Sequence, residues 1–176
     1  MKILLQCTLA LAAAMSLATA QNAPGNAAVT IGGKNISIKY SAPSVRGREG
    51  KIFGEGGLIS NDRTYPAWRA GANSATAFHT DAELDIAGLK VPAGDYTLFV
   101  GVKDPNAWEL IVNKQTGQWG LAYDSSKDLG HVKMTMSKPP AMVELLKYTL
   151  SDAGGNKAKL QLEWENHAAS VLMTVK

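Results

Sequence analysis

The four arginines of this sequence are the residues that point most directly to chemistry, because they lie together. They fall within one stretch of 24 residues, and the rest of the chain uses lysine instead. These arginines are Arg46, Arg48, Arg63 and Arg69. A guanidinium is preferred over an ammonium where a carboxylate or phosphate is bound by two parallel hydrogen bonds, or where a cation stacks on an aromatic ring. The cluster therefore predicts a site for a ligand with anionic or polar groups.

Ion pairs within the same stretch are the competing interpretation. Arg46 and Arg48 lie close in sequence to three acidic residues, Glu49, Glu55 and Asp62. Ion pairs that serve only the structure are commoner than binding sites. The sequence therefore leaves two alternatives: the arginines bind a ligand, or they form ion pairs that fix their own loop.

Arg69 is the arginine best placed to contact a ligand. It follows Trp68 and precedes Gly71 and Asn73, whose backbone freedom and amide group could shape the rim of a pocket. Aromatic rings near glycines at strand ends can stack on a ligand or cover a groove. The predicted ligand-binding residues are Arg48, Arg69, Asn73, Trp68, Thr76, Trp119 and Tyr123.

A second cluster could hold a metal ion. His79, Asp81 and Glu83 lie two residues apart, so a strand would place all three on one face. The same spacing is typical of a solvated polar face, and neither a nearby second histidine nor a known ligand motif accompanies it. We therefore predict no metal and no cofactor.

Hydrolase motifs are missing from the sequence. It contains no G-x-S-x-G, no H-E-x-x-H and no P-loop. His131 and His167 are isolated in sequence and are predicted to be ordinary surface or core residues. An exported hydrolase with a dispersed carboxylate or histidine site stays open as an alternative, and loss of turnover on changing His79 or Asp81 would favour it.

The first 20 residues predict a signal peptide. Lys2 precedes an almost continuous apolar run, and Ala18 and Ala20 supply the small residues at which a signal peptidase cuts. We predict cleavage after Ala20 and a periplasmic or secreted protein. The remaining 156 residues carry 17 basic and 15 acidic side chains, a balance that argues against nucleic-acid binding. They contain no cysteine and no apolar run long enough to span a membrane.

Alternating apolar residues predict an all-β protein. Period-two patterns broken by Gly, Pro, Asn and Asp indicate about ten short strands, and residues 96–100 are apolar on both faces of their strand, as in the centre of a sheet. Trp108 and Trp164 are predicted to pack in the core. We expect a flexible lead-in at residues 21–27 and one antiparallel β-sandwich or jelly roll over 28–176, with a long loop at 42–66.

The sequence resembles an uncharacterised bacterial family, the domain of unknown function numbered 2911. Six segments match the family pattern in order: 40–43, 47–48, 52–54, 68–73, 92–96 and 113–120. The resemblance implies an exported, mostly β domain and supplies no activity. The segment between Phe53 and Trp68 is longer and more polar than the family pattern, Ser74 stands where glutamate is frequent, and His131 stands near a common arginine. If the family site uses those charges, this member binds a different ligand or binds it more weakly.

The leading hypothesis is an exported β-sandwich that binds a small or extended polar ligand at a rim formed by the arginine loop and residues 68–76. A structural or assembly partner is a third hypothesis beside the hydrolase, and co-purification of a stable protein partner would support it. The sequence leaves the oligomeric state open.

Overall fold

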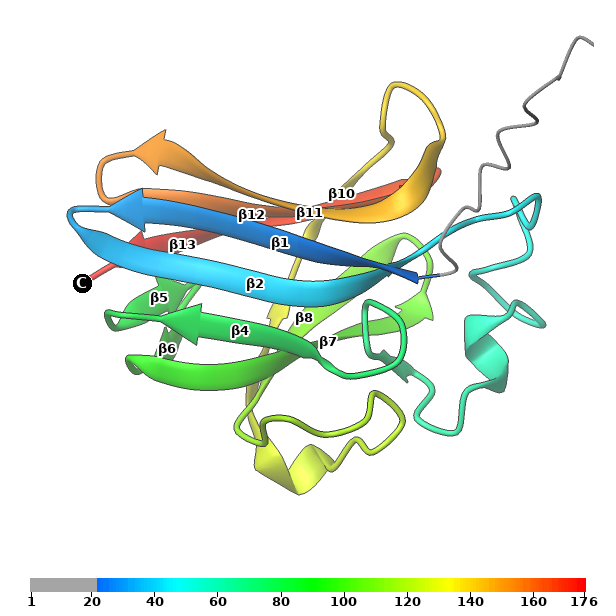
Figure 1. Ribbon diagram of the computed structural model, residues 1–176, viewed down its shortest axis with the longest axis horizontal. Coiled ribbons are helices and arrows are strands. Elements are labelled where there is room, and N and C mark those ends of the chain that lie inside the picture. Colours follow the sequence, from blue (N-terminus) through cyan, green and yellow to red (C-terminus); the bar gives the residue numbers. More distant parts are fainter. Residues whose placement is uncertain (1–21) are drawn as a thin grey trace, which may run out of the picture.

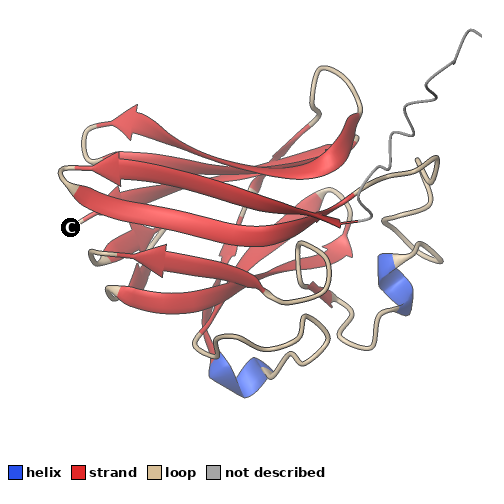
Figure 2. Ribbon diagram, in the orientation of Figure 1, coloured by secondary structure: helices blue, strands red, loops and turns tan. Residues whose placement is uncertain are grey.

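The structure, a computed structural model that describes residues 22–176, consists of two antiparallel β-sheets packed together (Figures 1 and 2). The first sheet contains β1 (Asn22–Ile31), β2 (Lys34–Pro43), β3 (Ala67–Trp68), β4 (Thr76–Thr80), β7 (Gly94–Asp104), β8 (Ala107–Asn113) and β9 (Asp128–Lys133). The second contains β5 (Leu84–Ile86), β6 (Leu89–Val91), β10 (Thr135–Ser137), β11 (Val143–Gly154), β12 (Lys157–Glu165) and β13 (His167–Val175). The predicted all-β sandwich is confirmed, whereas the predicted signal peptide, residues 1–20, lies outside the described residues.

The described part of the chain has thirteen strands, more than the ten or so predicted. Four of them, β3, β5, β6 and β10, are only two or three residues long. A period-two pattern needs at least four residues to be recognised, so these short strands leave little trace in the sequence. Two short 3-10 helices, η1 (Ile59–Asn61) and η2 (Ser125–Lys127), lie in loops (Figure 2).

The predicted flexible lead-in is mostly strand. β1 begins at Asn22 and pairs along its whole length with β2, from Asn22 opposite Pro43 to Ile31 opposite Lys34. A Cβ added to Gly25 would lie 2.3–2.7 Å from ring atoms of Tyr40, so the glycine makes room for this ring. The small residues that suggest a mobile segment are therefore there because a neighbouring ring covers the strand.

The core lies between the two sheets. Leu98 and Val100 of β7 point into it and are fully buried. β7 lies between β4 and β3 on one side and β8 on the other, which confirms its predicted central position. Phe99 faces the opposite way and is also buried, in a small second cluster on the outer face of the first sheet.

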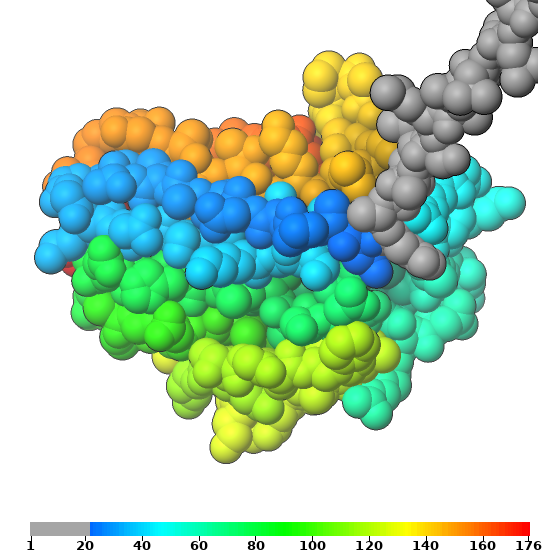
Figure 3. Space-filling view, viewed as in Figure 1, coloured from blue at the N-terminus to red at the C-terminus, as the bar shows by residue number. Residues whose placement is uncertain are grey.

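The long loop, residues 44–66, covers one end of the sandwich (Figures 1 and 3, cyan to turquoise). Phe53 anchors it in a cluster of aromatic rings, with centroid distances of 5.3 Å to Trp68, 4.9 Å to Trp108 and 5.8 Å to Trp164. Trp108 and Trp164 are buried, as predicted. Trp68 is also only 2% exposed, so its ring packs in the core under the loop.

A second loop, residues 114–127, covers the middle of the outer face of the first sheet. The Thr97 hydroxyl donates to the carbonyl of Gln115 at 2.8 Å, and the Asn113 amide donates to the carbonyl of Asp124 at 2.9 Å. Thr116, near the start of the loop, lines one hollow of this face, and Tyr123, near its end, lines another. None of the helices within residues 22–176 is long and apolar enough to cross a membrane.

Candidate functional site

Three of the arginines line one hollow where the long loop meets the sandwich. This hollow has a volume of about 430 Å³, and we call it the arginine cavity. Its polar lining includes Arg46, Arg48, Arg69, Asp62 and Asn73, and its apolar wall includes Trp68, Trp164, Leu58 and Ile59. The fold therefore brings together four of the residues predicted to bind a ligand, Arg48, Arg69, Asn73 and Trp68. Arg46 and Trp164 also line the cavity. Of these two, only Arg46 belongs to the arginine cluster identified in the sequence.

Arg48 is oriented by its own loop. Its Nε donates to the carbonyl of Val45 at 2.9 Å, and its Nη2 donates to the carbonyl of Ser44 at 2.6 Å. These two bonds use two of the five N–H donors of a guanidinium. The group is thus fixed in direction while its remaining donors stay available to a ligand in the cavity.

Arg69 forms an ion pair inside the cavity. Its Nη1 lies 3.1 Å from Oδ2 of Asp62, and the two side chains are 21% and 24% exposed. Its Nε is buried and has no hydrogen-bond partner among residues 22–176. An unsatisfied buried donor costs about 1–3 kcal/mol.

The backbone around the cavity is strained. Arg46, Ala70 and Asn73 have φ angles of 50°, 45° and 62°, in the left-handed region that disfavours residues with a Cβ. The carbonyl of Ala70 accepts hydrogen bonds from the hydroxyls of Thr76 and Tyr148, each at 3.1 Å, which hold it in this conformation. Backbone strain of about 1–3 kcal/mol per residue is concentrated at functional sites in proteins, and here it sets the position of the arginines.

Carboxylates of the second sheet hold the loop in place. Glu144 accepts hydrogen bonds from the Ser44 hydroxyl and, at 2.9 Å, from the Arg46 amide. The Ser44 hydroxyl first, and then the Arg46 amide, lower the pKa of Glu144. Glu165, only 2% exposed, accepts a hydrogen bond from the Gly50 amide. The loop is therefore attached to β11 and β12 through its backbone and Ser44.

The competing interpretation of the arginines as loop clamps is correct in part, with other partners than those predicted. Arg48 binds carbonyls of its own loop, and Asp62 pairs with Arg69. Arg63 lies outside the arginine cavity and donates from Nε to the carbonyl of Leu121 at 2.7 Å. Arg48, Arg69 and Asp62 therefore both hold the loop and line the cavity, so the two interpretations do not exclude each other.

The other three predicted site residues lie outside the lining of the arginine cavity. Thr76 is fully buried, and its hydroxyl supports the backbone at Arg69 and Ala70. Trp119 is 54% exposed and is joined to Ser74 by an isolated β-bridge. Tyr123 packs on Phe99 with a centroid distance of 4.7 Å, on the outer face of the first sheet.

Comparison with known proteins identifies the family to which the chain belongs. A family model described as "Protein of unknown function (DUF2911)" matches residues 23–173. The chain belongs to the DUF2911 family. No curated protein matches the chain, and no solved structure does. The matched range runs from β1 to β13, so the DUF2911 unit comprises both sheets of the sandwich and the loops that carry the arginines.

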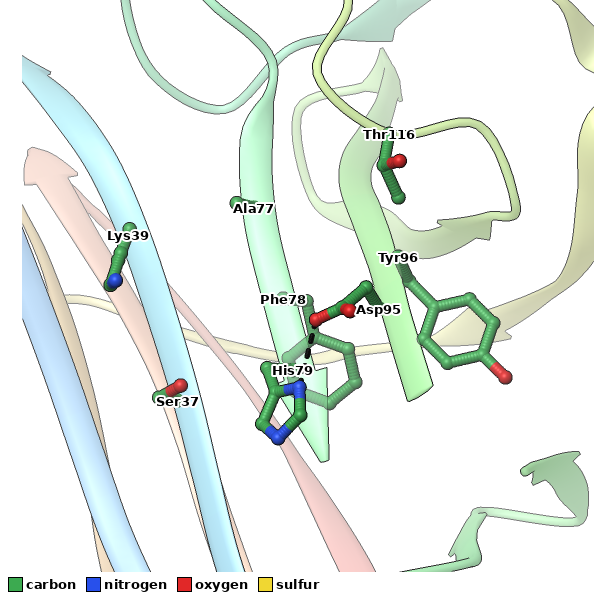
Figure 4. Close-up of a pocket in the computed structure, with 8 residues that line it drawn as sticks. All are labelled: Ser37, Lys39, Ala77, Phe78, His79, Asp95, Tyr96 and Thr116. Atoms are coloured by element: carbon green, nitrogen blue, oxygen red, sulfur yellow. Dashed lines mark hydrogen bonds and ion pairs between the residues drawn. The ribbon is translucent and has the colours of Figure 1, made fainter. Parts of the chain in front are cut away.

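The DUF2911 sandwich carries a second cluster of charged residues around His79 (Figure 4). Nδ1 of His79 lies 2.8 Å from Asp95, and Nε2 lies 2.9 Å from Asp81. Asp81 first, and then Asp95, raise the pKa of His79. When the ring is protonated both nitrogens donate to carboxylates, which leaves no lone pair for a metal ion or for general-base chemistry.

The predicted set of His79, Asp81 and Glu83 does not form on one strand face. β4 ends at Thr80, so the alternation that would align Asp81 and Glu83 with His79 stops there, and Asp95 of β7 takes the third place. The described residues of this DUF2911 chain contain no group of three or more His, Cys, Asp or Glu side chains placed to hold a metal ion. The cluster functions as an ion pair that ties β4 to its neighbours.

This cluster should make stability depend on pH. His79 has a raised pKa, so its contribution is complete below its ordinary pKa of 6.5 and is lost as the pH rises through the folded value. Asp81 has a pKa below 3.8, so its contribution is lost only in stronger acid. We expect the difference in unfolding free energy between the natural chain and His79→Gln, from urea titrations, to be larger at about pH 5.5 than at about pH 9. Asp81→Asn should show the same trend, and a difference independent of pH would contradict this assignment.

Proposed function

We propose that this protein is an exported binding protein whose arginine cavity takes a small ligand with an anionic group on an apolar body. The observation that carries the proposal is the lining of the cavity, in which three guanidiniums meet an apolar wall that includes the exposed side chain of Leu58. Export rests on the signal peptide predicted at residues 1–20, and an N-terminus at Gln21 in the mature protein would support it.

The size and the charge of the cavity support such a ligand. Its volume of about 430 Å³ falls in the range of about 300–1,000 Å³ that is usual for small-molecule sites. Three cations and one carboxylate, Asp62, line it, so its field favours an anion even though Glu144 lies close to Arg46. The apolar wall, in which Leu58 is 46% exposed, would bury the apolar part of the ligand.

The fixed orientation of the guanidinium donors supports a defined binding site rather than a flexible, positively charged surface. Arg48 is fixed by two backbone carbonyls, and Arg69 is fixed by Asp62. Because both groups are held before any ligand arrives, little side-chain entropy is lost on binding. The Arg69 side chain is 21% exposed, so the guanidinium N–H groups that do not bind Asp62 could donate to an incoming carboxylate or phosphate oxygen.

A hydrolase is less well supported. Each ring nitrogen of His79 lies within hydrogen-bond distance of a carboxylate, Nδ1 of Asp95 and Nε2 of Asp81. A general base needs a free lone pair within reach of the proton that it takes. This arrangement favours a structural ion pair over catalysis at that site.

Calorimetric titration with sodium benzoate, sodium acetate and inorganic phosphate tests the proposal. We expect benzoate to bind more tightly than acetate, because only benzoate has a ring to place against the apolar wall of the cavity. Arg69→Gln should weaken benzoate binding by about tenfold or more, since a hydrogen bond between charged groups contributes about 1.5–3 kcal/mol.

Arg63→Gln is the matched control, because Arg63 belongs to the same arginine cluster but lies outside the cavity. It should leave the benzoate affinity unchanged. If none of the three anions binds, or if both variants behave alike, the cavity is not an anion site, and a structural or assembly role becomes the better hypothesis.

A further inference from the structure

The outer face of the first sheet carries a second hollow, separate from the arginine cavity. It has a volume of about 740 Å³ and lies over β3, β7, β8 and β9, and we call it the outer hollow. Its floor and apolar walls include Tyr65, Pro66, Ala67, Gly101, Ile111 and Tyr123. This is the place where the structure puts Tyr123, which the sequence assigned to the arginine site.

Gly101 creates the floor of the outer hollow. It lies inside β7 and pairs with Ala67 of β3 on one side and with Glu109 of β8 on the other. A Cβ added there would meet its nearest neighbour, Glu109, at 3.7 Å, an ordinary contact, so packing does not demand a glycine. Central strand positions favour β-branched and aromatic residues, and a glycine inside a strand marks a β-bulge or a place where another molecule approaches closely. The pairing of β7 with β8 shifts register just after Gly101, and the space above the glycine stays open.

Polar groups converge at one side of this hollow. Asp128 is 10% exposed, and its Oδ2 accepts hydrogen bonds from the Tyr123 hydroxyl and, at 3.0 Å, from Nε2 of His131. Burial, and then Asp128, raise the pKa of Tyr123, so its hydroxyl keeps its proton and remains a donor to this carboxylate. Asp128 therefore fixes the ring of His131 with Nε2 as its N–H donor.

The other nitrogen of His131 then faces a second acceptor. Nδ1 of His131 lies 3.7 Å from Oε2 of Glu109, and in the neutral ring both atoms are acceptors that cannot bond to each other. A hydroxyl or amino group placed beside them could donate to either. The buried hydroxyl of Thr64, which also lines the hollow, has no hydrogen-bond partner within residues 22–176.

We propose that the outer hollow is a second binding site, for a ring-shaped apolar molecule that carries a hydrogen-bond donor. The ring rests on Gly101 and Ala67 against Tyr123, and the donor group, a hydroxyl or an amine, lies between His131 and Glu109. The outer hollow presents acceptors to a donor on its ligand, whereas the arginine cavity presents donors to an anion. The two sites are therefore independent, and either can exist without the other.

Titration with 4-propylphenol and 4-propylanisole tests the proposal, because these probes share their ring and chain and differ in the donor. We expect the phenol to bind about tenfold more tightly than the anisole. Gly101→Val should weaken both probes by about tenfold or more by filling the floor. Glu109→Gln should weaken the phenol alone, and Arg69→Gln, in the other cavity, should change neither.

Nuclear magnetic resonance on the natural chain keeps the test decisive if Gly101→Val does not fold. The phenol should then shift the backbone amide signals of Gly101 and Ile111 more than those of Arg69 and Asn73. Equal affinity for phenol and anisole, absence of binding by both probes, or a dimer in sedimentation experiments that Gly101→Val dissociates would each overturn the proposal.

Discussion

Replacing Trp68 by alanine is expected to lower the free energy of unfolding by about 3–5 kcal/mol. Trp68 is 2% exposed, and its ring lies 5.3 Å from Phe53, 5.9 Å from Trp108 and 5.7 Å from Trp164 by centroid distance. The last of these contacts is stacked, with an interplanar angle of 14°. Removing the ring would leave a space that these three rigid rings cannot close, and it would loosen the anchor of the long loop.

The measurement is urea unfolding followed by far-ultraviolet circular dichroism, which does not depend on tryptophan emission. Trp119→Ala is the matched control because the ring of Trp119 is 54% exposed. Its effect should stay within about 0.5 kcal/mol, as is usual for surface positions. Similar losses for the two variants would show that the Trp68 cluster is not the anchor that we describe.

Gly120→Ala is expected to distort the arginine cavity, although Gly120 is not part of its lining. A Cβ at this position would lie 2.1 Å from Cδ of Arg69 and 2.7 Å from the carbonyl oxygen of Asn73. The Gly120 amide donates to that same carbonyl at 2.9 Å, so the backbone cannot move away without losing a hydrogen bond. We expect a loss of about 1–3 kcal/mol in stability, the usual effect of overpacking, together with at least a tenfold loss of benzoate affinity.

Gly130→Ala serves as the control for this variant. Its added Cβ would lie 2.5 Å from a terminal methyl group of Leu89, a partly exposed side chain that can turn aside. It should cost less stability than Gly120→Ala and leave benzoate binding intact. Thermal unfolding and calorimetry on both variants give the comparison, and unchanged binding in folded Gly120→Ala would contradict the proposed role of Arg69.

The fold could be predicted because alternation is a local property of the chain. The strand around Leu98 and Val100 is apolar on both faces, and the structure buries both faces. The same local view failed at Gly25, where a small residue suggests mobility, although the ring of Tyr40 covers it. It also could not predict the burial of Trp68, because exposure of a ring depends on what the loop brings over it.

The candidate site was predictable only as far as its residues are neighbours in sequence. Arg48, Arg69 and Asn73 belong to one stretch, and they meet in one cavity. Trp119 and Tyr123 were predicted from their aromatic type and their place near glycines at strand ends, and the loop that follows β8 carries them elsewhere. No sequence pattern links Glu144 or Glu165 to the arginine loop, because those contacts depend on the packing of distant strands.

The attachment of the long loop to the second sheet sets an order of events during folding. The hydrogen bond from Arg46 to Glu144 joins residues 98 positions apart, and the one from Gly50 to Glu165 joins residues 115 positions apart. Closing chain segments of this length is slow compared with forming a hairpin. The arginines precede β11 and β12 in the chain, so their cavity is complete only when Glu144 and Trp164 of these strands have met the loop. An occupied arginine cavity would thus report that β11 and β12 have packed against the loop.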